Sequence, residues 1–397
     1  MPSPYVNSAY AGRMEPILVG SVADQRRDRT SVKWTLWGPE VLPLWVAEMD
    51  ARPCPAVVEA VTAAVRRGDT GYDFGVAYAE AAAAYAAHAW AWDIDPASTL
   101  GFADVMIGIE ALIRTVTDVD GAVLLSSPVY DSFYGFVATT GRPLVDVPLT
   151  AEGRLDLDAL KTAFAAAQAS GRRAAYLLCN PQNPVGTVHT RQELTTLAGL
   201  ALEYGVSVIA DEIHAPLVYA DSSPFVPYLT VAGDGPAFSV WSASKAWNLA
   251  GFKAALAVAG PGSVSDLGRV NEVHTHGVGH IGVIAHTAAL TSGREWLAQV
   301  VSELDQSRRL LARLVAEHLP GVVLRMPAAT YLAWLDARAL GLGDDPATVW
   351  RQTAGVGLSS GPNYGPVTGR GFARLNFATS PEILTEAIER IAAATYR

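Results

Sequence analysis

Two ionisable side chains each stand directly after an apolar run in this chain of 397 residues. Asp211 ends the run "GVSVIAD", and Lys245 follows "AFSVWSAS" 34 residues later. An amine with a lowered pKa can form a Schiff base with an aldehyde. A carboxylate that keeps a pyridine nitrogen protonated makes the ring an electron sink, and pyridoxal phosphate needs both groups. The pair therefore indicates a pyridoxal-phosphate site, although Asp211 has equal claim to be a helix N-cap.

Four short β-favouring runs position these groups, and each run stops at a polar or proline-containing loop. The runs end at Ser127-Pro128, Asn180-Pro181, Asp211-Glu212 and Ser244-Lys245. Helical stretches separate them, which indicates an α/β fold with a mainly parallel sheet. Because functional residues in such sheets gather where strands end and loops begin, the sequence predicts a ligand site at these strand ends.

The rest of the chain reads as further helices and a smaller second unit. The alanine-rich segments "PAVVEAVTAAVRRGD" and "YAEAAAAYAAHAWAW" have the composition of packed helices. After about residue 295, the helical "SELDQSRRLLARLVAEHL" precedes the strand-like "VVLRMPAATYLAWLDA" and "GFARLNFATS", then a closing helix. We therefore expect a three-layer, cofactor-binding domain at 61–294 and a small α+β domain at 295–397, which the N-terminal segment 1–60 joins.

Composition limits the partners. The chain has 29 Lys and Arg against 39 Asp and Glu, and a net charge of -10 disfavours broad attraction to nucleic acid or an anionic membrane. Its two cysteines, Cys54 and Cys179, are far apart, which suits reduced thiols, and no Cys/His cluster indicates a metal. The start "MPSPYVNSAYAGR" lacks a signal-peptide pattern, and no apolar run reaches the roughly 18 residues of a membrane helix. We expect a cytoplasmic protein.

Motifs spread over nearly the whole chain resemble those of one superfamily. The segments "CNPQNPVG", "ADEIHAPLV", "SASKAWNLAGFK" and "GFARLNFA" are similar, in that order, to fold-type I pyridoxal-phosphate enzymes of the class I/II aminotransferase superfamily. Within it, "LPLWVAEMD", "GYDFG", "SPVYDSFY" and "DEIH" resemble the MalY/PatB branch of cystathionine β-lyases, also called carbon-sulfur lyases. The resemblance implies the fold-type I architecture and pyridoxal 5'-phosphate as cofactor.

The resemblance assigns roles around the cofactor. Lys245 would hold it covalently and then take the substrate Cα proton, while Asp211 would pair with the ring nitrogen. Asn183 would donate a hydrogen bond to the phenolic oxygen, and Tyr130 would stack on the ring. The positions that match phosphate contacts are Ser242, Ser244, Lys253 and the backbone N–H groups of Val105 and Met106, at the start of an expected helix.

Further positions match a substrate site and a second subunit. Arg374 would grip the substrate α-carboxylate in a planar two-bond pair, and the N–H of Ala47 would bind the same carboxylate. Tyr364 stands where an aromatic residue, usually phenylalanine, is common. Tyr72 matches a tyrosine that reaches the phosphate of the neighbouring subunit, so the resemblance implies a homodimer with shared active sites. His214, where many aminotransferases carry tyrosine, would lie near the cofactor.

Most of these residues also suit an ordinary structural role. Tyr130 and Tyr72 have the character of half-buried packing aromatics, and Arg374 taken alone suits a surface ion pair. His214 suits a satisfied polar group beside the cofactor, and Asn183 suits a proline-rich turn. Core packing and the substrate mouth are equal alternatives for three tryptophans, Trp34, Trp37 and Trp45.

A few positions depart from the family pattern. Gln182 stands where close relatives often have histidine, and Val185 where the wider superfamily usually has threonine. The stretch "HTHGVGHIG", with His274 and His280, is also unusual. We expect Gln182, Tyr364 and this histidine stretch to alter the substrate pocket more than the cofactor site.

The resemblance implies β-elimination of an L-cysteine S-conjugate such as cystathionine, giving a thiol, pyruvate and ammonia. Alternatives remain open, because fold resemblance is weak support for one reaction. They are an aminotransferase, a tailoring enzyme of secondary metabolism that acts on a cysteinylated intermediate with or without decarboxylation, and a regulatory partner of a transcription factor.

Overall fold

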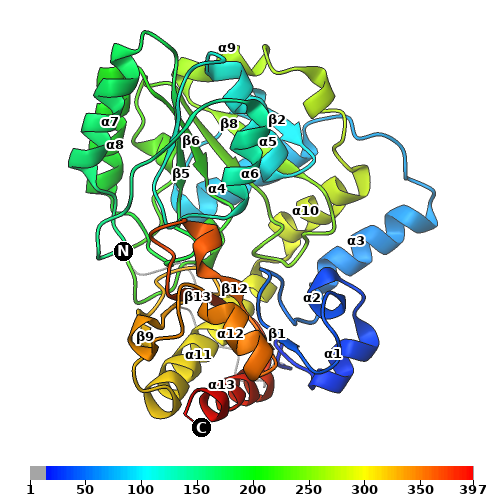
Figure 1. Ribbon diagram of the computed structural model, residues 1–397. Coiled ribbons are helices and arrows are strands. Elements are labelled where there is room, and N and C mark those ends of the chain that lie inside the picture. The colour runs from blue at the N-terminus through cyan, green and yellow to red at the C-terminus, as the bar shows by residue number, and fades with distance from the viewer. Residues whose placement is uncertain (1–14, 397) are drawn as a thin grey trace. The chain divides into compact units, whose positions relative to one another are not determined.

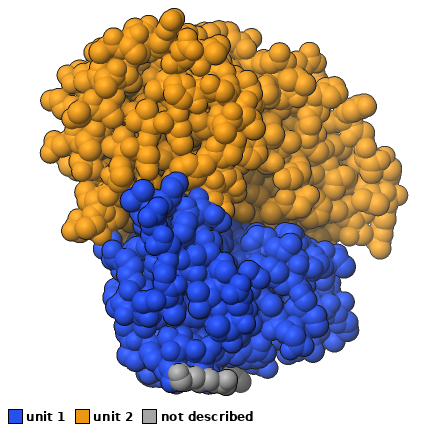
Figure 2. Space-filling model, viewed as in Figure 1, with its two compact units in different colours: residues 1–52, 183–186, 298–397 blue, residues 53–182, 187–297 orange. Residues whose placement is uncertain are grey.

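The computed structural model describes residues 15–396, so the expectation for the first 13 residues lies outside the described part. The chain divides into two compact units (Figure 2). Unit 1 comprises residues 1–52, 183–186 and 298–397, and unit 2 comprises residues 53–182 and 187–297. The domain boundaries expected after residues 60 and 294 stay a prediction.

A seven-stranded sheet forms the centre of unit 2. Its strands follow the order β2 (Thr99–Phe102), β8 (Ala255–Ala259), β7 (Ala237–Trp241), β6 (Ser207–Asp211), β5 (Ala175–Cys179), β3 (Val123–Leu125) and β4 (Leu144–Asp146). The strands from β7 to β4 are all parallel, and β8 is antiparallel to both of its neighbours. The four predicted strand runs correspond to β3, β5, β6 and β7. The mainly parallel sheet is therefore confirmed.

Helices cover both faces of this sheet, which makes three layers (Figure 1). Successive side chains of a strand point to opposite faces, so Val123 and Leu125 pack with α5 (Val105–Val116) and α6 (Ser132–Thr140). Leu124 instead packs with α7 (Leu157–Ala169) and α8 (Arg191–Tyr204). Because both faces are buried, these strands are continuously apolar rather than alternating. Truncating Leu124 to alanine would cost about 2–5 kcal/mol.

Four more helices complete unit 2. The two predicted alanine-rich helices are α3 (Pro55–Arg66) and α4 (Ala77–Trp90), and α10 (His280–Ser292) packs against both. The short α9 (Val264–Leu267) follows β8. The loop 67–76 joins α3 to α4 and is largely exposed.

Unit 1 is built on an antiparallel sheet, as expected for the α+β part. Its order is β12 (Ser359–Ser360), β13 (Phe372–Asn376), β10 (Leu332–Asp336) and β9 (Val323–Leu324). A second, parallel pair joins β1 (Leu42–Pro43) to β11 (Val356–Gly357), so the N-terminal segment pairs with the C-terminal part of the chain. The helices are α1 (Val22–Asp28), α2 (Val32–Thr35), most of α11 (Arg294–His318), α12 (Pro346–Thr353) and α13 (Pro381–Thr395).

Two further sequence expectations concern compartment. No disulfide joins Cys54 and Cys179, and both thiols are buried. Among residues 15–396, no helix combines the length and the apolar character needed to cross a lipid bilayer.

Candidate active site

The strand ends expected to carry chemistry meet at one edge of the unit 2 sheet. β3, β5, β6 and β7 are consecutive parallel neighbours, so their carboxyl ends share that edge. Asp211 is the last residue of β6, Asn180 follows β5, and Lys245 lies shortly after β7. The polar residues that follow these strands therefore lie at one edge of the sheet, and the ligand site expected there stays a prediction.

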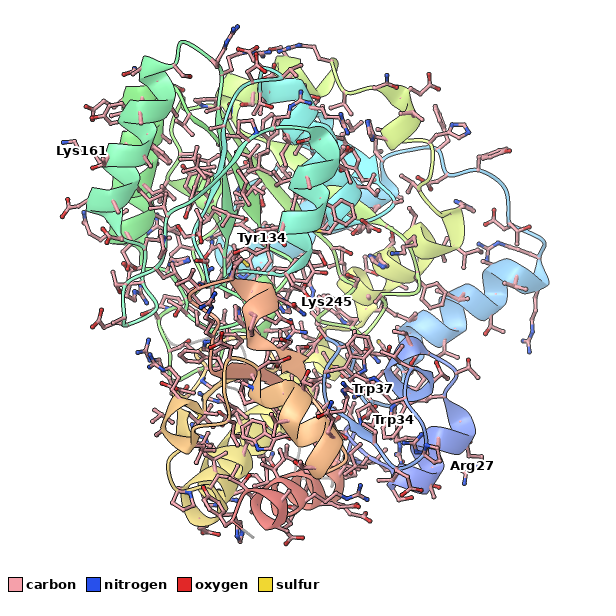
Figure 3. The ribbon with its side chains drawn as sticks, in the orientation of Figure 1. Arg27, Trp34, Trp37, Tyr134, Lys161 and Lys245 are labelled. Atoms are coloured by element: carbon pink, nitrogen blue, oxygen red, sulfur yellow. The ribbon has the colours of Figure 1, made fainter. Side chains whose placement is uncertain are left out.

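Lys245 lies in a tight turn that follows β7 (Figure 3). The backbone N–H of Trp247 donates to the Ala243 carbonyl at 3.0 Å. The buried indole of Trp247 donates its Nε1–H to the Gly293 carbonyl at 2.9 Å, which anchors the turn in the core. Lys245 itself is half-buried. The fold therefore holds this amine on a fixed turn without closing it off from a ligand.

Asp211 is a buried carboxyl group with a strongly raised pKa. Burial raises the pKa from 3.8 to about 7, and the N–H of Ile213 and the charge of Lys245 offset this only in part. Oδ1 accepts a hydrogen bond from the Ile213 N–H at 3.1 Å, and no basic group within residues 15–396 lies within 4.0 Å of the carboxylate. The N-cap alternative is wrong, because Asp211 ends a strand and the next helical turn begins after His214. A cationic ring nitrogen fits this carboxyl.

The start of α5 offers donors for a phosphate. Asp104 caps the helix, and its Oδ1 accepts from the Ile107 N–H at 3.0 Å. Val105 and Met106 occupy the first helical positions, whose N–H groups have no intrahelical acceptor. The Lys253 ammonium contacts Asp104 Oδ2 at 3.0 Å, so Lys253 reaches this helix end and neutralises the capping carboxylate. The helix predicted to begin at Val105 is confirmed, while its phosphate contact stays a prediction.

Ser242 is more enclosed than its predicted role requires. Its hydroxyl donates to the Ala254 carbonyl at 2.7 Å and accepts from the Ser244 N–H at 3.2 Å. A phosphate contact of Ser242 would need the hydroxyl proton that Ala254 already accepts. Ser244 is half-buried and follows directly in the turn before Lys245. In this arrangement Ser242 shapes the turn, and Ser244 is the more accessible of the two hydroxyls.

His286 and Tyr78 form a buried polar pair next to Ser242, and the sequence did not indicate this pair. His286 on α10 has Nδ1 at 3.2 Å from the Tyr78 hydroxyl and 3.4 Å from Ser242 Oγ. Burial lowers the pKa of His286 to about 4, so its imidazole is neutral. The only sequence signal for this pair was their place in apolar helical segments, which predicts core packing.

The remaining unit 2 residues occupy different surroundings. Tyr130 is half-buried, with its ring at 5.8 Å from that of Phe133 in an edge-on arrangement. His214 is buried directly after β6. Tyr72 is 89% exposed on the loop between α3 and α4. Tyr72 therefore does not pack into the core of its own chain, and the packing alternative for it is wrong.

In unit 1, Arg374 on β13 is a buried guanidinium that has only neutral partners among the described residues. Nη1 donates to Asn183 Oδ1 at 3.2 Å, and Nη2 donates to the Trp45 carbonyl at 2.9 Å. Nη2 also lies 3.3 Å from Ser359 Oγ, and Nε has no acceptor within residues 15–396. The guanidinium stacks 4.8 Å from the centre of the Tyr364 ring. The surface ion-pair alternative is wrong, and a buried guanidinium with no carboxylate partner suits an anionic ligand.

Asn183 is oriented by this arginine. Because Oδ1 accepts from Arg374, the amide nitrogen is the donor end of the side chain, as the predicted hydrogen bond to a phenolic oxygen requires. The following turn is fixed by Gly186, whose φ is 71° and whose carbonyl accepts from the N–H groups of Ala328 and Ala329. A Cβ on Gly186 would meet Pro327 at 2.5 Å. The turn role and the ligand role are therefore compatible.

The segment 45–50 presents the other predicted substrate contact. The Tyr331 hydroxyl donates to the Ala47 carbonyl at 3.0 Å, which anchors the segment at the peptide bond after Ala47. Trp34 is buried and donates its Nε1–H to Asp50 Oδ1 at 2.8 Å, so core packing is its role. Trp37 and Trp45 are half-buried, with ring centres 5.3 Å apart.

Two strand-end residues proved structural. Gln182 is buried, and its amide donates to the carbonyls of Ser126 and Pro128 at 3.1 and 3.0 Å. Gln182 therefore joins the ends of β5 and β3. Glu212 accepts from Asn180 Nδ2 at 2.9 Å and from the Tyr228 N–H at 2.8 Å, and burial raises its pKa to about 7. The sequence could have indicated that Asp211 and Glu212 have different roles, because neighbouring residues of a strand point to opposite faces of the sheet.

Comparison with known proteins places this arrangement in a family. The family described as "Aminotransferase class I and II" matches residues 39–391. The chain belongs to the class I and II aminotransferase family. Within this family, the "Putative cystathionine beta-lyase" of Mycobacterium tuberculosis is 48% identical over 387 residues, covering 92% of this chain and 95% of the relative. The cystathionine β-lyase of Corynebacterium glutamicum is 32% identical over 371 residues, covering 93% and 98%.

A solved structure of this aminotransferase family has the same fold. The putative pyridoxal-phosphate-dependent β-cystathionase of Corynebacterium diphtheriae superposes with a TM-score of 0.89 at 34% identity, covering 96% of this chain and 99% of that one. The resemblance to the MalY/PatB type and the fold-type I architecture are therefore confirmed.

Proposed function

We propose that this protein is a pyridoxal-phosphate-dependent carbon-sulfur lyase that eliminates a thiol from an L-cysteine S-conjugate such as cystathionine. The observation that carries the proposal is Asp211, a buried carboxyl whose pKa lies near 7, at the strand end beside the Lys245 turn. Relatives named cystathionine β-lyase support elimination rather than another reaction of the family.

The residues divide the work. Arg374 and the Ala47 N–H bind the α-carboxylate, and Asn183 orients the cofactor through its amide donor. Asp211 would keep the ring nitrogen protonated, and pyridoxal phosphate, when bound, would supply an electron sink for the electron pair left at Cα. Lys245 Nζ takes the Cα proton.

The products follow from the bonds that change. Departure of the thiolate from Cβ leaves a double bond between Cα and Cβ. The released enamine reacts with water to give pyruvate and ammonia. Tyr130 would pack on the ring face, and the helix start at Val105 and Met106, with Ser244 and Lys253, would bind the phosphate.

A homodimer completes the proposal. Tyr72 is exposed on its own chain, so it is available to reach the phosphate held by a second copy. Mixed dimers of Tyr72→Phe and Lys245→Ala test this, because one of the two sites in such a dimer would hold both native residues. Activity above that of either variant supports sharing, and no recovery contradicts it. The two buried thiols without a disulfide suit the cytoplasm as the compartment.

The reaction is tested by giving the purified holoenzyme L-cystathionine and assaying pyruvate and ammonia together. Equal release of both without an added keto acid supports elimination. Amino transfer that depends on a keto acid, with no pyruvate and ammonia from cystathionine, would favour an aminotransferase. Carbon dioxide release would favour a decarboxylating tailoring enzyme, and a transcription factor recovered by pull-down with no turnover would favour a regulatory role.

A further inference from the structure

His280 makes an unusual contact with both ends of a surface loop. It is the first residue of α10, and its two ring nitrogens face two carboxylates. Nε2 lies 3.1 Å from Asp69 Oδ1, and Nδ1 lies 3.2 Å from Asp73 Oδ1. Asp69 and Asp73 flank Tyr72 in the loop that joins α3 to α4. One imidazole therefore holds both sides of the loop segment that carries Tyr72.

This geometry requires a particular protonation state. A neutral imidazole has one N–H donor and one lone pair, so one of its nitrogens would face a carboxylate without a proton between them. Only the imidazolium donates from both nitrogens. The positive end of the α10 helix dipole opposes a cation at His280, and two carboxylates are positioned to outweigh it. Consistently, the hydrogen bond with Asp73, followed by that with Asp69, raises the pKa of His280 above 6.5 despite partial burial.

The loop is otherwise turned outward. Asp69 and Asp73 are half-buried, while Tyr72 is 89% exposed and Phe74 is fully exposed. The Tyr72 ring lies near that of His276, with ring centres 6.2 Å apart. An exposed loop of this kind loses conformational freedom only if something ties it down, and the two contacts of His280 do so on both sides of Tyr72.

We propose that His280 is a positioning residue whose imidazolium clamps Asp69 and Asp73 and so presents Tyr72 to a second copy of this chain, which makes the shared cofactor site depend on the protonation of His280. This rests on the homodimer proposed above. It also gives a role to the unusual "HTHGVGHIG" stretch, which the elimination chemistry does not use.

Other charged groups around the clamp modify it without replacing it. Arg67 contacts the second oxygen of Asp69 at 2.7 Å and competes for that carboxylate. Lys253 has its backbone against the start of α10, but its ammonium contacts Asp104. Within residues 15–396, no ion pair joins His280 to Arg66 of α3 or to Glu80 of α4.

The direction of the pH effect follows from the raised pKa. The clamp is complete below the ordinary histidine pKa of about 6.5 and is lost as the pH rises through the higher pKa of the folded protein. Because the contacts are partly exposed, salt should weaken them as well. The shared site should therefore be tightest in mildly acidic, low-salt conditions.

The first test titrates His280 in the holoenzyme by nitrogen NMR of histidine-labelled protein. We expect both ring nitrogens protonated near neutral pH and a titration above about 6.5. Asp73→Asn should lower that titration, because an amide oxygen attracts the imidazolium less. A histidine that titrates at its ordinary pH, or that does not respond to Asp73→Asn, would overturn the clamp.

The second test compares His280→Gln with His88→Gln, a substitution of an exposed histidine on α4. Dimer affinity and pyridoxal-phosphate affinity are measured from about pH 6 to about pH 8.5. We expect both to weaken about threefold to tenfold in wild type and His88→Gln as the pH rises, and to be weak and nearly flat in His280→Gln. Equal profiles for all three proteins would overturn the positioning role.

A third variant separates this failure from failure of the proposed shared site. Tyr72→Phe should weaken pyridoxal-phosphate affinity at every pH if Tyr72 serves the partner. If Tyr72→Phe has no effect while His280 still titrates high, the shared site is wrong although the clamp exists. If Tyr72→Phe weakens binding and His280→Gln does not, the shared site stands and the role of His280 is overturned.

Discussion

Each unit of the molecule contains a buried aspartate near a lysine, and the two pairs are satisfied in opposite ways. In unit 1, Asp50 and Lys33 are both fully buried, with Lys33 Nζ at 2.8 Å from Asp50 Oδ2. Trp34 donates to the other oxygen at 2.8 Å, and Lys33 also donates to the Glu48 carbonyl at 3.1 Å. The chain itself therefore supplies a partner to each oxygen of this carboxylate.

In unit 2, Asp211 is also buried, but its carboxylate accepts one backbone N–H and feels the charge of Lys245 without a described ion pair within 4.0 Å. Burial raises its pKa to about 7, and these two interactions offset only part of that rise. Both acids are therefore buried. They differ in their partners, because Asp50 has an ion pair and an indole donor, whereas the carboxylate of Asp211 has one backbone donor. A buried carboxylate that forms no ion pair with the described residues is where a cationic ligand stabilises the structure most.

The largest effect is expected from Lys245→Ala. The visible absorbance band of the covalently held cofactor should disappear, and turnover should fall by at least about a hundredfold, because no other base can take the Cα proton. Lys161→Ala is the control, since Lys161 is exposed on α7 (Figure 3). A Lys245→Ala protein that keeps the band would contradict the assignment.

Substituting Asp211 and Asp50 by asparagine should affect different properties, turnover in the first case and stability in the second. Asp211→Asn should lose about a hundredfold in turnover, whereas Asp50→Asn should lose about 3–5 kcal/mol of stability because Lys33 stays buried without its partner. Activity assays and urea unfolding of both variants check this. Near-normal turnover of Asp211→Asn would remove its catalytic role.

The pH dependence of the cofactor-free protein sharpens the same contrast. Asp211 has a pKa of about 7 in the folded chain and 3.8 ordinarily, so the folded state binds an extra proton between these values. Stability should therefore fall as the pH rises from about 4 to about 7, by up to about 4 kcal/mol. Asp211→Asn should remove this contribution, whereas the fall that Glu212 causes should remain, because burial raises the pKa of Glu212 to about 7 as well. If the free energy of unfolding changes with pH equally in wild type and variant, the pKa of Asp211 is not raised by folding.

The next largest effect is expected on KM, from substitution of Arg374 with Arg338 as its matched control. Arg374 is buried and has no carboxylate partner among the described residues, whereas Arg338 is exposed and paired with Asp336 at 2.6 Å. Arg374→Lys should raise KM about tenfold or more by replacing a planar fork with a point charge, and Arg338→Lys should leave KM unchanged. A similar KM for wild type and Arg374→Lys would count against carboxylate binding.

The smallest effect concerns Trp34 in the satisfied pair. Trp34→Phe keeps the aromatic packing but removes the donor to Asp50 Oδ1, which should lower the free energy of unfolding by about 1–3 kcal/mol. Thermal or urea unfolding measures this, with Trp37→Phe as a half-buried comparison (Figure 3). Equal stability of Trp34→Phe and wild type would mean that the hydrogen bond contributes little.

The sequence predicted the strands and their ends well because local patterns determine them. Both faces of β5 and β6 are buried, so continuous apolar runs marked them, and polar loops marked where Asn180 and Asp211 would stand. Motif order then indicated the family. The unit 1 contact of Arg374 with Trp45 joins segments 329 positions apart, and no local pattern predicts such a contact.

The contacts that the sequence failed to predict are mainly polar ones between residues far apart in the chain. His280 lies 207 positions from Asp73 in the chain, and His286 lies 208 positions from Tyr78. Only folding brings them together, so the sequence indicated an unusual histidine stretch without its partners. Lys33 and Asp50 were missed for a related reason, because a charged residue in a polar N-terminal segment gives no sign that it will be buried.

The measurement that tests the central claim most directly compares pyridoxal phosphate with an analogue whose ring nitrogen is replaced by carbon. If the protonated ring nitrogen forms an ion pair with Asp211, wild-type protein should bind pyridoxal phosphate at least about tenfold more tightly than the analogue. The preference should largely vanish in Asp211→Asn. An equal preference in both proteins would contradict the account, because Asp211 would then not be the partner of that nitrogen.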